Sequence, residues 1–249
     1  MGSLENMGQK YFQEMGFNRY KFSPEDKKAI CAYYEYWHTD NGDGVFIQPI
    51  SKEDYNAMQY YREFLPDVCL LWHDGQGNYA GAYTSGILHG KVMFLSHGEP
   101  NYAPLFRSIS SFLECVRNRD IEFLDSPDFG VCDYPSKNMP ELEKKQNLEI
   151  AKHFLDSLSN IDDEEVYSQT AKKIWYLMPS DNLDLLIPLM ESGNMYVEQD
   201  ISDIFVFHNY RNAIPALREA AKNGSIYIQD SAKIALKKMR DSFKRTEYA

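Results

Sequence analysis

The sequence predicts an α+β protein in two parts, and a contrast along its 249 residues leads to this prediction. Up to about residue 140 the chain is rich in glycine, aromatic residues and short β-type runs, and it holds 12 of the 18 tyrosines. Beyond residue 140 apolar residues recur almost without interruption at helical spacing. We therefore expect a small antiparallel sheet with flanking helices, followed by an all-α array of helical hairpins.

The first predicted helix has a clear start signal at Ser23. A serine hydroxyl caps a helix N-terminus, Pro24 suits the first helical position, and Asp26 takes the place of the capping-box acid. A second helix is predicted over 51–64, again after a capping serine, Ser51. Between these helices VFIQPI is predicted as a short strand or extended link.

Three β-type runs follow, separated by glycine-containing turns. They are VCLLW at 68–72, NYAGAYT at 78–84 and KVMFL at 91–95, with HDGQG and SGILHG between them. Asp-Gly and Gly between such runs are typical of hairpins, so we expect an antiparallel meander. The run SISSFLECVR at 108–117 places its apolar residues on one helical face and predicts a closing helix.

The second half contains a weak internal repeat. Segments 185–205 and 213–236 share Ile-Pro, then a polar turn, then a tyrosine followed by a β-branched residue, and the two tyrosines, Tyr196 and Tyr227, are 31 residues apart. Self-similarity at this period is typical of stacked helical hairpins. The predicted helices of this half are 141–159, 164–178, 182–192, 195–208, 212–223 and 226–245.

Three segments make up the predicted domain organisation. Residues 1–125 form the α+β domain and residues 141–249 form the helical domain. Residues 126–140 contain three prolines and no sustained periodicity, so they are predicted as a linker.

Charge and apolar patterning exclude several classes of protein. The 26 Lys+Arg against 37 Asp+Glu give a net charge of -11, whereas DNA, RNA and anionic membranes attract basic surfaces. The longest apolar runs are far shorter than the roughly 20 residues of a membrane-spanning helix. The four cysteines form no C-x-x-C pair, and the opening residues lack a secretory pattern. We expect a cytoplasmic protein that binds neither nucleic acid nor membrane.

Two motifs of the sheet region are similar to a nucleotide-binding loop and to a metal site, and we predict neither kind of site from them. GQGNYAG at 75–81 imitates a dinucleotide loop, but a strand-like run follows it where that loop requires a helix, so glycines of a hairpin turn explain it better. A metal-dependent enzyme is kept as a minor alternative because histidines and acids gather in this region: His73, Asp74, His89, His97 and Glu99. These histidines lie at predicted turns, where histidine is commonly solvated. We predict no catalytic residue, cofactor or metal ligand.

The stretch 65–116 resembles the SUKH superfamily, which contains the yeast cell-wall-synthesis regulator and many bacterial immunity proteins. The likeness rests on an apolar strand leading into HDGQGN, a Lys-Val-aromatic strand at 91–95, a His-Gly-Glu turn and the helix SISSFLECV. It covers about residues 20–125, and the Asn-Gly-Gly segment usual before the sheet is reduced to DNGDG at 40–44. The second half is similar to HEAT-like repeats, on AIPALREA, a short turn and DSAKIALKKM.

The resemblance implies a non-catalytic protein-binding module. The leading interpretation is a bacterial immunity-type protein that neutralises a cognate toxin, such as a basic nuclease domain. Divided at residue 140, the net charge is -7 before and -4 after, so the first half is expected to meet a basic partner. The alternative is a regulatory scaffold that binds a peptide or protein through its helical array.

Candidate contact residues come from the predicted turns and helix ends of the first half. Acids would steer a basic partner and aromatic residues would anchor it. The acids are Asp40, Asp43, Asp67, Asp74 and Glu99, and the aromatic contacts are Trp37 and Tyr79. A wider aromatic set that includes Tyr60 and Tyr61 is also suited to a docking surface if it is exposed.

Overall fold

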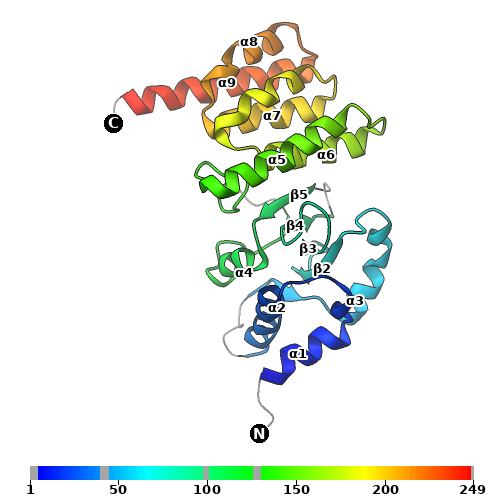
Figure 1. Ribbon diagram of the computed structural model, residues 1–249. Coiled ribbons are helices and arrows are strands. Elements are labelled where there is room, and N and C mark those ends of the chain that lie inside the picture. Colours follow the sequence, from blue (N-terminus) through cyan, green and yellow to red (C-terminus); the bar gives the residue numbers. More distant parts are fainter. Residues whose placement is uncertain (1–4, 40–44, 98–100, 126–129, 248–249) are drawn as a thin grey trace. The chain divides into compact units, whose positions relative to one another are not determined.

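The structure is a computed structural model that describes residues 5–39, 45–97, 101–125 and 130–247. The fold is α+β, as the sequence predicts, with an antiparallel sheet in the first half and a run of helices in the second (Figure 1). The chain divides into two compact units, Met1–Tyr134 and Pro135–Ala249. This boundary lies inside the segment 126–140 that the sequence predicts as a linker. Tyr134 is buried in the first unit, where its backbone N–H donates to the Leu105 carbonyl at 3.0 Å.

Five strands form the sheet of the first unit, in the order of the sequence and with antiparallel neighbours. They are β1 (Gln48–Pro49), β2 (Val68–His73), β3 (Tyr79–Tyr83), β4 (Val92–Leu95) and β5 (Asn101–Phe106). The predicted meander is thus confirmed, with one strand more than the sequence indicates. The additional strand, β5, contains Pro104, which weakens a strand prediction but is tolerated at the edge of a sheet, where β5 lies.

One face of the sheet packs its aromatic side chains against helix α4 (Ile109–Arg117). Trp72 and Phe94 share this face because both pair with Ala80 of β3. The ring of Phe112 in α4 lies 5.0 Å from the ring of Trp72 and 5.7 Å from that of Phe94. Helix α2 (Pro24–Trp37) adds Tyr33, whose ring meets Trp72 edge to face at 6.3 Å. These contacts form the core that fixes the sheet.

The helices before the sheet are α1 (Glu5–Glu14) and α2, joined by the short 3-10 helix η1 (Phe17–Arg19). The predicted capping box of α2 is present, since the Asp26 N–H donates to the Ser23 hydroxyl at 3.0 Å and the Ser23 N–H donates to the Asp26 carboxylate at 3.3 Å. Helix α1 lies outside the predicted elements. It packs on α2 with the rings of Tyr11 and Tyr34 stacked at 4.0 Å.

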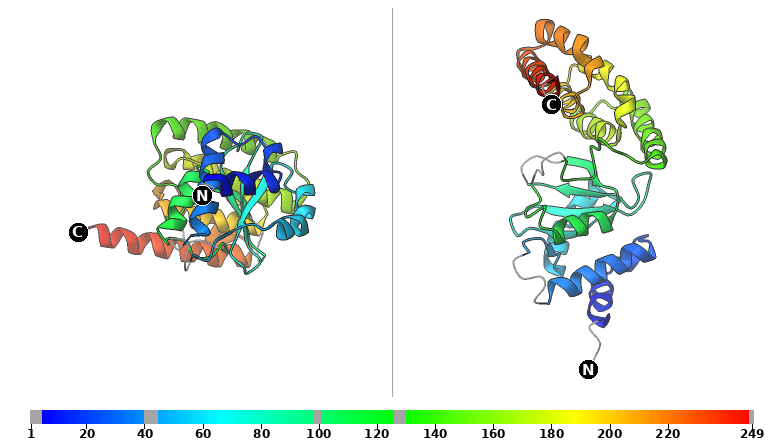
Figure 2. Two further views of the ribbon diagram at one scale, coloured as in Figure 1. Left: turned by 90° about the horizontal axis from the view of Figure 1, so that it is seen from below. Right: turned by 90° about the vertical axis from the view of Figure 1, so that its left-hand side faces the viewer.

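The second unit is a series of helical hairpins. Its elements are α5 (Glu141–Leu158), α6 (Glu164–Leu177), η4 (Ser180–Glu191), α7 (Met195–His208), η5 (Arg211–Ala213), α8 (Ile214–Asn223) and α9 (Ile226–Glu247). Within this unit α5 packs on α6, η4 on α7 and α8 on α9, while α7 also contacts α6 and α9 (Figure 2). The helix predicted at 182–192 is a 3-10 helix, and it contains Pro188, which has no N–H to donate to an α-helical ladder.

The internal repeat is more regular in the structure than in the sequence. Helices α6, α7 and α9 begin at Glu164, Met195 and Ile226, so their starts are 31 residues apart. The same spacing relates buried positions of α7 to buried positions of α9: Val197 to Ile228, Ile201 to Ala232, and Ile204 to Ala235. The start spacing therefore occurs in three successive hairpins, and the buried positions repeat in the last two, which also share the visible sequence motifs.

Helix α7 ends in a histidine whose charge is suppressed. The partial negative charge of a helix C-terminus favours protonated histidine. Burial has the opposite effect and is stronger at His208, and together with the nearby Lys137 it lowers the pKa of His208 to about 4. Among the described residues, Nε2 of His208 has no hydrogen-bond partner. The imidazole of His208 is therefore uncharged in the folded protein at neutral pH.

Acid should destabilise the second unit through His208. An unfolded histidine takes up a proton near pH 6.5, whereas the folded one does so only near pH 4, so the free energy of unfolding should fall as the pH drops through this window. We expect a loss of about 1–3 kcal/mol between pH 7 and pH 4.5, measured by urea unfolding with circular dichroism. His208→Gln should flatten this dependence, and His153→Gln, at an exposed site on α5, should keep it. An unchanged slope in His208→Gln would contradict the assignment.

Candidate functional site

The segment after β1 folds into two short helices that expose aromatic side chains. The Ser51 hydroxyl accepts a hydrogen bond from the Asp54 N–H at 3.0 Å and starts α3 (Lys52–Ala57). The chain then tightens into the 3-10 helix η3 (Met58–Glu63), so the predicted helix 51–64 exists as two elements. Tyr60 is 54% exposed and Phe64, just after η3, is 69% exposed. Two large aromatic side chains thus face solvent within five residues.

Tyrosines from two strands lie beside Tyr60 and its neighbour Tyr61. The hydrogen bond with Tyr60, burial, and the neighbouring hydroxyls of Tyr102 and Tyr79 raise the pKa of Tyr61 to about 12. The Tyr60 and Tyr61 rings are 4.2 Å apart. Strand β3 supplies Tyr79 and strand β5 supplies Tyr102, so the sheet brings together residues that are far apart in the sequence. The aromatic surface is Tyr60, Tyr61, Phe64, Tyr79 and Tyr102.

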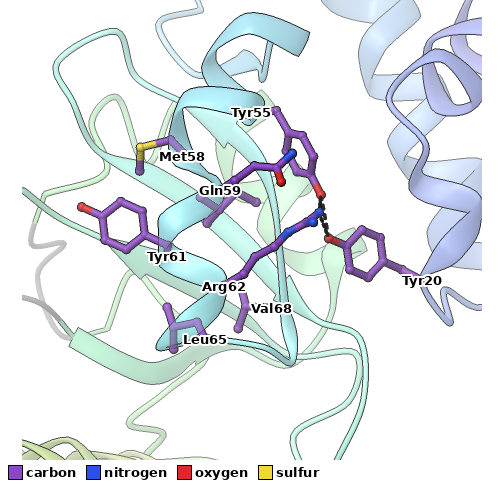
Figure 3. Close-up of a pocket in the computed structure, with 9 residues that line it drawn as sticks. Tyr20, Tyr55, Met58, Gln59, Tyr61, Arg62, Leu65 and Val68 are labelled. Atoms are coloured by element: carbon purple, nitrogen blue, oxygen red, sulfur yellow. Dashed lines mark hydrogen bonds between the residues drawn. The ribbon is translucent and has the colours of Figure 1, made fainter.

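Two arginines and two tyrosines meet where this segment contacts η1, and Figure 3 shows three of them, Tyr20, Tyr55 and Arg62. Arg19 and Arg62 each donate a hydrogen bond from Nη2 to the Tyr55 hydroxyl. Arg62 also donates to the Tyr20 hydroxyl at 2.6 Å, and the two hydroxyl oxygens are 2.6 Å apart. In Figure 3 the guanidinium of Arg62 points toward both phenols, while Tyr61 points away from them. These four residues form the arginine–tyrosine cluster.

The cluster carries positive charge that its own residues do not neutralise. Burial raises the pKa of Tyr20 and of Tyr55, so both phenols are uncharged at neutral pH. Among the described residues, no carboxylate lies within 4.0 Å of the guanidinium nitrogens of Arg19 or Arg62. The aromatic rings lie within 5.1–5.9 Å of the guanidinium carbons and give weaker cation–π contacts.

A small cavity lies under η3 beside the cluster. Its volume is about 20 Å³, and its walls include Tyr20, Tyr55, Arg62 and the apolar side chains of Val68 and Leu70. A water molecule needs roughly 10–15 Å³ of such space, whereas pockets for organic ligands are typically hundreds of Å³. The cavity is therefore too small to bind an organic substrate. Any ligand of this region would contact the side chains exposed at the protein surface.

The structure places the predicted contact residues in different settings. Asp40, Asp43 and Glu99 lie outside the described residues. Asp67 is exposed and its carboxylate accepts a hydrogen bond from Ser85. Trp37 is half-buried at the end of α2, while Tyr79 belongs to the aromatic surface.

Asp74 is not the exposed docking residue that its turn position predicts. It is 5% exposed, and its carboxylate accepts hydrogen bonds from Asn78 Nδ2 at 2.8 Å and from the backbone N–H groups of Gln76 and Leu124 at 2.8 and 3.0 Å. Burial alone raises the pKa of Asp74, but these hydrogen bonds outweigh burial and lower it. The β2–β3 turn needs an internal acceptor, and Asp74 provides it.

Removing the Asp74 carboxylate should weaken the first unit. Asp74→Ala leaves several buried donors without an acceptor, so we expect the free energy of unfolding to fall by about 2–4 kcal/mol. Urea unfolding followed by tryptophan fluorescence measures this change. Asp125→Ala, at an exposed aspartate, should alter stability by less than about 0.5 kcal/mol. A similar effect of both substitutions would contradict the proposed role of Asp74.

The three histidines of the sheet region have separate partners. His73 Nδ1 accepts from the Gly75 N–H at 3.3 Å, His89 Nε2 lies 2.6 Å from the Lys21 carbonyl, and His97 Nδ1 lies 2.9 Å from Asn78 Oδ1. In the part of the chain that the structure describes, no group of three or more His, Cys, Asp or Glu could hold a metal ion. In the same residues, no helix has the length and apolar character needed to cross a membrane.

The fold and surface together define a two-unit α+β protein with an exposed aromatic surface and an adjacent arginine–tyrosine cluster. We compared the chain with protein-family models, curated proteins and solved structures, and found no match. The resemblance to the SUKH superfamily and to HEAT-like repeats therefore stays a prediction that rests on the motifs quoted above.

Only part of this site is predictable from the sequence. Tyr60, Tyr61 and Tyr79 are among the aromatic residues that the sequence predicts as contacts, whereas Phe64, Tyr102 and the arginine–tyrosine cluster are not. The available signal for the cluster is weak, because Tyr20 and Arg62 are 42 residues apart and belong to no motif. An adjacent Arg-Tyr pair at 19–20 and a Tyr-Tyr-Arg run at 60–62 are too common in sequences to indicate a site.

Proposed function

We propose that the chain is a non-catalytic protein-binding module that docks through its aromatic surface. The observation that carries this proposal is the exposure of Tyr60, which lies beside Tyr61, Tyr79 and Tyr102, and of Phe64 four residues further along the chain. Tyrosine and arginine dominate the binding energy of protein interfaces, and contiguous exposed apolar patches mark interaction sites. The adjacent small cavity favours a docking surface over a pocket for an organic substrate.

Within this class, we propose a bacterial immunity-type protein that binds and neutralises a cognate toxin in the cytoplasm. Support comes from the SUKH-like motifs at 65–116 and from the net charge of -7 on residues 1–140. Exposed acids lie in the same segments as the aromatic surface, at Glu53, Glu63 and Asp67. Such acids would speed the approach of a basic toxin domain, and the aromatic residues would slow its release. Toxin activity would be blocked by occlusion of its active cleft.

The partner itself provides the first test of this proposal. The partner is captured from the native organism with the tagged chain, identified by mass spectrometry and purified for binding measurements. A toxin encoded beside this gene would be the expected partner, and its expression should kill cells only when the chain is absent. Survival that does not depend on the chain would contradict toxin neutralisation, while measured binding would still support the broader class.

Tyr60 and Phe64 should be the main anchors of the interface. Tyr60→Ala and Phe64→Ala should each weaken binding of the purified partner by about 10- to 30-fold, because each removes an exposed aromatic side chain without opening the core. Calorimetry measures the affinity and thermal melting checks the fold. Ile87→Ala, at another exposed apolar side chain of the first unit, should change affinity less than about threefold. Full affinity in both aromatic variants would exclude this surface.

The second unit favours a second candidate function, a scaffold that binds a peptide through its helical array. Tyr196 and Tyr227 occupy equivalent positions near the starts of α7 and α9 and are 60% and 66% exposed. A groove of about 660 Å³ lies between hairpins of this unit, and its walls include Met190, Met195 and Glu219. If this function is correct, Tyr196→Ala and Tyr227→Ala would reduce binding while Tyr60→Ala would not.

A further inference from the structure

In the arginine–tyrosine cluster, two cationic side chains contact one uncharged oxygen. The packing of the fold does not explain this arrangement. Arg19 and Arg62 both donate from Nη2 to the Tyr55 hydroxyl. Two positive charges that contact the same oxygen atom repel each other, and an uncharged phenol does not neutralise them. Arginines in proteins commonly pair with carboxylates, and this chain has 37 Asp and Glu residues against 26 Lys and Arg. Even so, neither guanidinium has a carboxylate within 4.0 Å among the described residues.

Both guanidinium groups have hydrogen-bond donors to spare. A guanidinium carries five N–H donors in a planar fork that matches the oxygens of a carboxylate or a phosphate. The hydrogen bonds of Arg19 and Arg62 to described residues use Nη2 in both cases. Nε and Nη1 of both arginines have no acceptor among the described residues. Arg62 is half-buried and Arg19 is exposed, so a ligand can approach the pair from solvent.

The supporting contacts hold the pair in place from three elements. Arg19 belongs to η1, Tyr55 to α3 and Arg62 to η3. Tyr55 is itself buried, and its ring packs against the buried ring of Phe17 at 5.6 Å. The phenol that both arginines contact is therefore fixed by the core, and it positions the two forks before any ligand arrives.

We propose that the arginine–tyrosine cluster is a binding site for an oxyanion, a phosphate or carboxylate group. The anion supplies the negative charge that the cluster lacks, and it accepts hydrogen bonds from the free Nε and Nη1 donors. The oxyanion site shares no residue with the aromatic surface and does not depend on the proposed partner. It adds a receptor for negative charge to a chain whose overall composition is acidic.

Titration of the unmodified protein with sodium phosphate tests the site directly. The Nε–Hε signals of Arg19 and Arg62 are followed by NMR, with sodium chloride at matched ionic strength as the reference. We expect saturable shifts of both signals with phosphate, weaker saturation with acetate and none with chloride. Equal shifts in phosphate and chloride would overturn the proposal, because general screening would then explain them.

Arg62→Gln separates ligand binding from a purely structural role. It should weaken phosphate binding at least about tenfold, because one fork and one charge are lost. Without phosphate its melting temperature should equal or exceed that of the unmodified protein, because the repulsion is relieved. In phosphate the unmodified protein should gain about 2–4 °C and Arg62→Gln should not. Equal destabilisation in both buffers would assign the cluster a structural role only and overturn the proposal.

Arg117→Gln is the matched control. Arg117 also lies over two tyrosine rings of the same unit, 6.0 Å from the centre of Tyr33 and 5.5 Å from that of Tyr36. Among the described residues it shares no hydroxyl with a second arginine. Its substitution should leave phosphate affinity unchanged. An equal loss of affinity in Arg117→Gln would show that phosphate responds to total charge and would overturn the proposal. If Arg62→Gln does not fold, Tyr55→Phe replaces it as the variant, and the titration of the unmodified protein still tests whether phosphate binds at the cluster.

Discussion

The packing of Phe112 against the sheet is the contact on which the first unit depends. Its ring meets aromatic side chains of β2, β4 and β5 at 5.0–5.7 Å, so one helix holds strands that pair with their sequence neighbours. A meander without such cover is marginal in water. Because β3 and β5 are fixed in this way, Tyr79 and Tyr102 come to lie beside η3. The aromatic surface thus depends on the packing of α4 over one face of the sheet.

Net charge and local charge lead to different conclusions about this protein. A net charge of -11 predicts that a basic partner is attracted from a distance, since the long-range field reflects the sum of all charges. Short-range recognition depends on the groups within a few ångströms, and there two guanidinium groups converge on one phenol. An acidic chain can therefore attract a basic protein and still contain a receptor for an anionic group.

Local rules explain which parts of the fold were predictable. The start of α2 depends on Ser23, Pro24 and Asp26, which are adjacent in the sequence, and the hairpins depend on glycine in short turns. Helix η4 could not be assigned by periodicity, because 3-10 and α helices share similar apolar spacing and differ in their hydrogen bonds. Strand β5 contains Pro104, which is acceptable because β5 is an edge strand of the sheet that the described residues form.

The sequence by itself determined the α+β class, the turns and caps, the position of most elements and the 31-residue spacing of Tyr196 and Tyr227. It also indicated Tyr60, Tyr61 and Tyr79 as candidate contacts. Only the tertiary structure decided that Asp74 is buried and that two distant arginines share one phenol. The physical reason is range: caps and turns form between residues a few positions apart, whereas burial and charge convergence depend on which distant segments the core brings together.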